Sequence, residues 1–209
     1  VYLGSRMDDG LDMPPYLFYK FEYEDVACTL HRFLALKDAQ GWEWDTVMPV
    51  DIVSLPLALA LATHLGVGTE PLKEGRTLVV QALGETVEGL QDAAERLRNA
   101  QTFCLSACWP EEWRPDIVGV ATPIVGSLPW YRTRAVSQLH AIIFGDDASD
   151  TLKQQVWQDP RSPEAIADDI LAALVTISDE PNLPMQVEYY QQHAQLRWQV
   201  EPQGGGMGC

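Results

Sequence analysis

Short apolar runs alternate with helical patterns between residues 42 and 132, and this alternation constrains the fold more than any other feature. The predicted strands are residues 46–50, 77–80, 102–108 and 116–120, and helices are predicted at residues 56–65 and 87–99. Strands that alternate with helices at this spacing form βαβ units, whose parallel strands are buried on both faces and read as continuous apolar runs. The sequence therefore predicts an α/β fold with a parallel-sheet core.

The segments on either side of this core carry weaker signals. A strand is predicted at residues 16–21 and a helix with an acidic first turn at residues 24–37. Later helices are predicted at residues 135–144, 151–157 and 162–177, and a terminal hairpin at residues 185–190 and 196–200. We expect a single domain over residues 1–209, with its core at 42–132, a helical extension at 133–180, and the C-terminal hairpin and tail at 181–209.

The charge of the chain excludes several classes of partner. Thirty Asp and Glu residues against 14 Lys and Arg give a net charge of −16, whereas binding to nucleic acid or to an anionic membrane needs a surplus of cations. The longest apolar run, residues 52–68, is too short and too interrupted by polar residues to form a transmembrane segment. We expect the partner to be another protein with a basic surface, or a second copy of the chain in a homo-oligomer.

Cysteine and histidine usage predicts neither a metal site nor a cofactor. The four cysteines form no Cys-x-x-Cys pair, and the four histidines are scattered along the chain. Buried thiols in a reducing compartment are the simplest interpretation, so we expect a cytoplasmic protein with no metal, no cofactor and no catalytic residue.

Ligands of open parallel sheets bind at the carboxyl ends of the strands, and this rule selects the loops at residues 51–55 and 81–86. The candidate ligand-binding residues in and after these loops are Asp51, Ser54, Gln81, Gly84, Glu85, Thr86, Glu88 and Gly89.

Four segments in this region resemble, in their order and spacing, those of the type I phosphoribosyltransferases. They are residues 47–60 (VMPVDIVSLPLALA), 75–90 (GRTLVVQALGETVEGL), 115–119 (PDIVG) and 128–131 (LPWY). The resemblance implies that the first segment corresponds to the pyrophosphate loop and the second to the strand, acidic pair and loop that hold the sugar phosphate. It also implies a phosphoribosyltransferase-like parallel-sheet core, followed by a helical C-terminal part and a terminal β-hairpin.

The residues at the functional positions of that family differ in this chain. The family's acidic pair, which handles the ribose hydroxyls and magnesium, falls on Gln81 and Ala82, and its phosphate loop falls on a segment that contains Glu85 and Glu88. A carboxylate within about 6 Å of a phosphate repels it by roughly 1–3 kcal/mol. The same two glutamates also suit the first turn of a helix, which favours negative charge. Only Ser54 and Thr86 retain chemistry suited to phosphate, so the sequence favours a non-catalytic protein of this type.

Aromatic residues near the predicted strand ends are candidates for an interface, because Trp and Tyr often anchor protein–protein contacts. They are equally typical of a core or a lid, and the candidates are Trp42, Trp44, Trp113, Trp130, Tyr131 and Trp198.

Three hypotheses follow from the sequence. The first is a non-catalytic phosphoribosyltransferase-like domain, a regulatory pseudoenzyme that binds another protein. The second is an active phosphoribosyltransferase or a protein that binds a nucleotide or a phosphosugar, and the third is a structural or assembly subunit that uses residues 185–200 as an interface.

Overall fold

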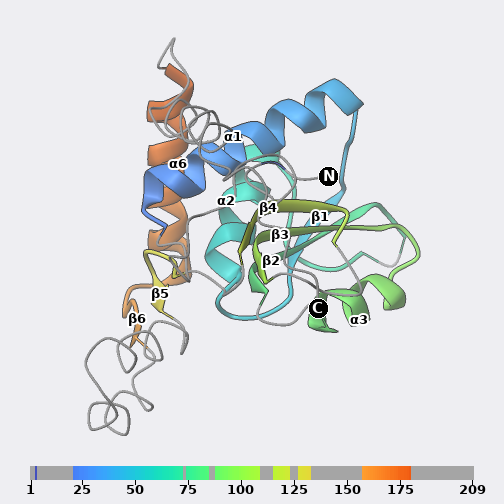
Figure 1. Ribbon diagram of the computed structural model, residues 1–209. Coiled ribbons are helices and arrows are strands. Elements are labelled where there is room, and N and C mark those ends of the chain that lie inside the picture. The colour runs from blue at the N-terminus through green and yellow to red at the C-terminus, as the bar shows by residue number, and fades with distance from the viewer. Residues whose placement is uncertain are drawn as a thin grey trace, which may run out of the picture.

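A four-stranded parallel sheet forms the centre of the computed structural model, which describes residues 3, 21–72, 74–84, 88–108, 115–122, 127–132 and 157–179. The strand order is β1-β2-β3-β4, and the strands are Thr46–Pro49, Thr77–Gly84, Ala100–Cys108 and Ile117–Thr122 (Figure 1). Thr46 pairs with Thr77, and Thr77 pairs with Ala100, so the first three strands start together at one edge. The predicted α/β fold with a parallel sheet is confirmed.

Helices cover both faces of this sheet (Figure 1). Helices α1 (Tyr23–Gln40), α2 (Leu55–Leu65) and α6 (Pro163–Asp179) share one hydrophobic core with the strands. Helix α3 (Glu88–Arg96) buries Leu90 in a smaller core on the other face. A two-stranded antiparallel ribbon of β5 (Tyr131–Arg132) and β6 (Trp157–Gln158) lies outside the main sheet.

The helices begin and end where local chemistry requires it. At the start of α1, the Glu22 N–H donates to Asp25 Oδ2 over 2.7 Å, which completes a capping box. Both α1 and α2 end at a glycine in the left-handed conformation, Gly41 (φ 65°) and Gly66 (φ 69°), where a side chain would be strained. The N–H of Ala165 donates to Ser162 Oγ at the start of α6, as the sequence predicts.

Two residues of the PDIVG segment fix the position of β4. Asp116 Oδ2 accepts hydrogen bonds from the N–H and the hydroxyl of Thr102, at 2.8 and 2.9 Å, and this joins β4 to β3 in register. Gly119 lies where an added Cβ would meet the carbonyl of Leu105 and, at 2.8 Å, Cγ2 of Thr29 on α1. The absence of a side chain at Gly119 therefore allows α1 to pack closely on the sheet.

Several sequence-based boundaries need correction. Helix α1 extends to Gln40, past the predicted residue 37, and β3 begins at Ala100, before the predicted residue 102. The second strand extends to Gly84, so Gln81 and Gly84 lie in a strand and not in the predicted loop, because residues 81–84 continue the parallel pairing with residues 104–107. Helix α3 ends at Arg96, short of the predicted residue 99. Trp157, predicted to end a helix, is in β6, where it pairs with Arg132 and its ring lies under the Arg132 guanidinium. Of the strand predicted at 16–21, Phe21 is described and is not in a strand. Residues 16–20, the predicted helices within 133–156 and the hairpin at 185–200 lie outside the described residues.

The side chain of Arg161 joins α6 to α1. Its guanidinium donates to Asp169 Oδ2 over 2.7 Å, to both oxygens of Asp159, and to the hydroxyl of Tyr23 over 3.1 Å. The Tyr23 ring in turn stacks on Trp130, with 6.2 Å between the ring centroids. This network ties the start of α6 to the start of α1 and to the segment that precedes β5.

We predict that Gly119→Ala destabilises the protein by about 3 kcal/mol. The added methyl group would clash with backbone atoms of Leu105 and would push α1 away from the sheet. Gly68→Ala is the matched control, since a Cβ at Gly68 has no atom within 4 Å. Urea unfolding of both variants measures the difference. Equal stabilities would show that α1 does not depend on the close approach at Gly119.

We also predict a loss of stability in acid that depends on Asp159. Hydrogen bonds from the side chain of Arg161, and then from its backbone N–H, hold the pKa of Asp159 below its ordinary value. A carboxyl group with a lower pKa in the folded state stabilises the fold above its unfolded pKa, and this contribution is lost as the pH falls through the folded pKa. The unfolding free energy should therefore decrease below about pH 4, and Asp159→Asn should flatten the decrease.

Urea unfolding between pH 7 and pH 2 measures this effect. Asp168→Asn is the control, because it removes a carboxylate from an exposed position on α6. Equal flattening in both variants would assign the acid sensitivity to net charge and not to the Arg161 network.

Candidate functional site

The structure brings most of the predicted ligand-binding residues together at the carboxyl edge of the sheet. Asp51 and Ser54 lie in the turn after β1, Gln81 and Gly84 at the end of β2, and Glu88 and Gly89 at the start of α3. A Cβ at Gly84 would lie 3.5 Å from Gln81 Oε1, and a Cβ at Gly89 would lie 3.0 Å from Val50 Cγ1. Glu85 and Thr86 lie outside the described residues.

The hydroxyl of Ser54 is used within the fold. Ser54 is fully buried, and its Oγ donates to Asp51 Oδ1 over 2.7 Å while it accepts a 2.9 Å hydrogen bond from the N–H of Ala82 on β2. Asp51 Oδ1 also accepts from the N–H of Ser54 over 2.7 Å. The loop after β1 is thus closed on itself by a carboxylate and attached to β2 by a hydroxyl.

The end of β2 carries no carboxylate. Gln81 and Ala82, where the sequence resemblance places an acidic pair, are 6% and 0% exposed. Gly84 lies against Cys104 on β3, whose Sγ would be 2.9 Å from an added Cβ. Burial raises the pKa of the Cys104 thiol to about 12, and the thiol donates to the Ser106 carbonyl, so Cys104 supplies no nucleophile at neutral pH.

Among its described residues, this edge offers negative charge to a ligand. Asp51 and Glu88 are both exposed. The sequence has no Lys or Arg at residues 50–54, 85–87 or 123–126, the segments that follow β1, β2 and β4, and residues 109–114 after β3 contain Arg114 alongside Glu111 and Glu112. An anionic ligand that approaches this edge therefore meets carboxylates where it needs cations or unpaired N–H groups.

The interface candidates separate into two groups. Trp130 and Trp44 are 2% and 7% exposed and belong to the core, so their rings do not form an interface surface. Trp130 Nε1 donates to the carbonyl of Val53 over 2.9 Å and braces the loop after β1. Trp42 and Tyr131 are half-buried. Trp113 and Trp198 lie outside the described residues.

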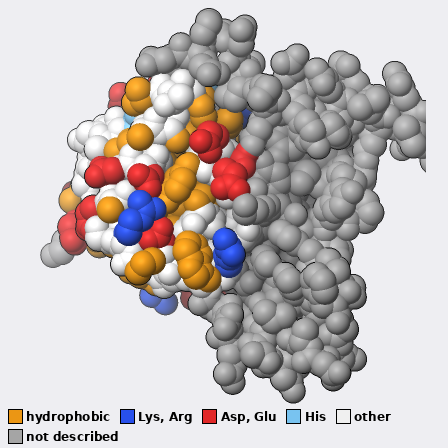
Figure 2. Space-filling model, turned by 90° about the vertical axis from the view of Figure 1, so that its left-hand side faces the viewer, with side chains coloured by type: hydrophobic (Ala, Val, Ile, Leu, Met, Phe, Trp, Pro, Cys, Tyr) orange, Lys and Arg blue, Asp and Glu red, His pale blue; other side chains and the backbone are white. Residues whose placement is uncertain are grey.

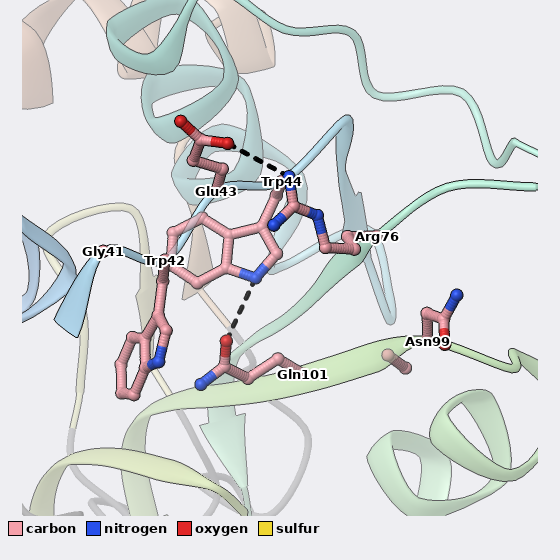
Figure 3. Close-up of a pocket in the computed structure, with 8 residues that line it drawn as sticks. Gly41, Trp42, Glu43, Trp44, Arg76, Asn99 and Gln101 are labelled. Carbon is pink, nitrogen blue, oxygen red and sulfur yellow. Dashed lines mark hydrogen bonds and ion pairs between the residues drawn. The ribbon is translucent and has the colours of Figure 1, made fainter.

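A cleft of about 400 Å³ opens at the opposite, amino edge of the sheet. Residues 41–44, Arg76 and residues 99–101 line it, which precede or begin β1, β2 and β3 (Figure 3). Sequence reasoning proposed Trp42 and Trp44 but missed Arg76 and Gln101, because the rule for ligand binding in parallel sheets selects the carboxyl edge. The common start of the three strands is the signal that could have found them.

No protein-family model matches the chain, and no curated protein matches it. A purine phosphoribosyltransferase from Pyrococcus horikoshii Ot3 has a similar structure, with a TM-score of 0.48 and 16% sequence identity over 55% of this chain and 95% of that chain. The α/β fold of this chain rests on its own sheet topology.

The described ranges contain neither a membrane-spanning helix nor a cluster of metal-ligating side chains. No helix there is long and apolar enough to cross a bilayer. Over the same residues, no three His, Cys, Asp or Glu side chains are grouped so that they could hold a metal ion.

We predict that Ser54→Ala lowers the unfolding free energy by about 1–3 kcal/mol, because the buried N–H of Ala82 loses its acceptor. Thr63→Ala, at an exposed position of α2, is the control and should be neutral or slightly stabilising, since alanine favours helix. Thermal and urea unfolding give both values. A Ser54→Ala variant as stable as the wild type would show that the Ser54 bridge does not hold the loop.

Proposed function

We propose that this chain is a phosphoribosyltransferase-like domain that transfers no phosphoribosyl group and acts by binding another protein. The observation that carries the proposal is the hydrogen bonding of Ser54. Its hydroxyl is the phosphate-compatible side chain of the first loop, and both Asp51 and the N–H of Ala82 already engage it.

Phosphoribosyl transfer needs groups at this edge that are free to bind phosphate and magnesium. Phosphoryl and pyrophosphoryl groups are bound by free backbone N–H groups, cations and helix N-termini. Here the N–H of Ser54 is occupied by Asp51, and Glu88 places a carboxylate in the first turn of α3. Magnesium bound by a substrate needs oxygen ligands from the protein, and Gln81 and Ala82 present no carboxylate at the end of β2.

The surface charge supports a protein partner with a basic face. The net charge of the chain is −16. On the side of the molecule seen in Figure 2, acidic side chains are spread among hydrophobic ones, and basic side chains are fewer. Mixed acidic and apolar surface suits association with a complementary protein and disfavours nucleic acid.

Calorimetry of the full chain with phosphoribosyl pyrophosphate, with and without magnesium, tests the proposal. We expect no saturable heat, which corresponds to a Kd weaker than about 1 mM. Proteins that are captured from the source cell should then stay bound when phosphoribosyl pyrophosphate is added, and should be released as salt is raised, because charge complementarity weakens with ionic strength.

Micromolar binding of phosphoribosyl pyrophosphate or of a nucleotide would refute the non-catalytic role. Such binding would favour the alternative, an active transferase or a phosphosugar-binding protein. Repeating the titration on Asp51→Asn with Glu88→Gln separates the causes, since this pair removes two charges and nearly preserves the side-chain shapes. Binding by the variant alone would identify charge, and not the Ser54 bond, as what excludes the ligand.

A further inference from the structure

The cleft at the amino edge has rigid walls. The buried ring of Trp44 stacks on Phe33 with 5.6 Å between centroids, and Phe33 stacks on Phe103 of β3 at 4.7 Å. Trp42 follows Gly41 at the end of α1, and its N–H donates to the carbonyl of Lys37 over 3.0 Å, which closes a Schellman motif. Because these positions are set before any ligand arrives, little conformational entropy is lost on binding.

The cleft presents hydrogen-bond donors that need acceptors. Trp44 Nε1 donates to Gln101 Oε1 over 3.1 Å. An indole nitrogen can only donate, so the amide oxygen of Gln101 must face Trp44 and its NH₂ group must face away, toward Trp42 (Figure 3). Within the described part of the chain, neither that NH₂ group nor Trp42 Nε1 has a hydrogen-bond partner. A ligand that fits this side of the cleft therefore carries acceptor oxygens.

The charges at the rim of the cleft balance each other. Arg76 Nη2 lies 3.1 Å from Glu43 Oε2, and both side chains are exposed. The pair gives the cleft neither a net positive nor a net negative charge, and the charge of −16 on the whole chain disfavours an anion such as a nucleotide. The ligand that suits this rim is neutral, with carbonyl oxygens and an apolar part.

The geometry points to a proline-containing extended segment of a partner protein as the occupant of this cleft, held by Trp42 and Gln101. A polyproline II segment makes no internal hydrogen bonds, so its carbonyls are free to accept from the indole and amide N–H groups. Proline rings pack on exposed tryptophan in aromatic-lined grooves, and the half-buried ring of Trp42 offers such a face. The inference rests on the proposed function in one respect, that the partner is a protein.

Selection from a phage-displayed library of random dodecapeptides on the full chain tests the inference. Enriched peptides are then synthesised with acetyl and amide caps, so that no terminal charge contributes, and titrated by fluorescence anisotropy. We expect proline-containing peptides with affinities that fall at least tenfold in Trp42→Ala and in Gln101→Glu. The second variant keeps an oxygen acceptor for Trp44 but replaces the NH₂ donor with negative charge, which repels peptide carbonyls.

Trp157→Ala is the matched control, because Trp157 is a surface tryptophan, 41% accessible, that is absent from the lining of this cleft. It should leave peptide binding unchanged, and circular dichroism should show native folds for all three variants. Failure to enrich any peptide, or enrichment of peptides that bind both cleft variants as tightly as the wild type, would overturn the inference.

A competing occupant is tested in the same assay with adenosine and uridine. Binding of either nucleoside that depends on Trp42 and displaces the peptides would also overturn the inference, since it would make the cleft a small-molecule site. Neither result bears on phosphoribosyl transfer, which the calorimetric titration tests at the other edge of the sheet.

Discussion

The hydroxyl of Ser54 joins the ends of two parallel strands, and the arrangement of the carboxyl edge follows from this contact. One hydrogen bond attaches the turn after β1 to β2, and another engages Asp51. The indole of Trp130 donates to the carbonyl of Val53 in the same turn. A buried hydroxyl with both a donor and an acceptor partner is costly to disturb. The edge where parallel sheets commonly bind ligands is thereby built as part of the core.

In this chain, the segments that resemble a phosphoribosyltransferase have structural roles that require no substrate. Asp116 sets the register of β4 through Thr102, and Gly119 admits α1 to the sheet. Trp130 fills the core and braces the turn at Val53. Residues that maintain packing and register are needed whether or not a reaction takes place. Packing and register therefore account for these segments without any contact to phosphate or magnesium.

Periodicity and local chemistry were enough to predict most of the described fold. The helix end at Gly66, the Ser162 cap and the parallel strands all depend on short-range signals. The errors arise where long-range contacts decide the outcome. Glycine at position 84 is typical of a turn, yet pairing with β3 keeps Gly84 in the strand. Trp157 lies in the antiparallel ribbon, where its ring contacts the Arg132 guanidinium. Burial of Trp44 and Trp130 also could not be predicted, because aromatic residues at strand ends are equally typical of interfaces and cores.

The two edges of the sheet differ in the groups that they present to a ligand, and the proposed partner site follows from this difference. At the carboxyl edge the described polar groups of Ser54 and Asp51 bond to each other and to β2, and the remaining charge is negative. At the amino edge an aromatic stack fixes Trp44, Trp44 orients the amide of Gln101, and donor groups are left facing a cleft. Preorganised donors beside an aromatic face lower the entropic cost of holding an extended peptide. Recognition of a partner is therefore best sought at the edge opposite to the one that the phosphoribosyltransferase resemblance selects.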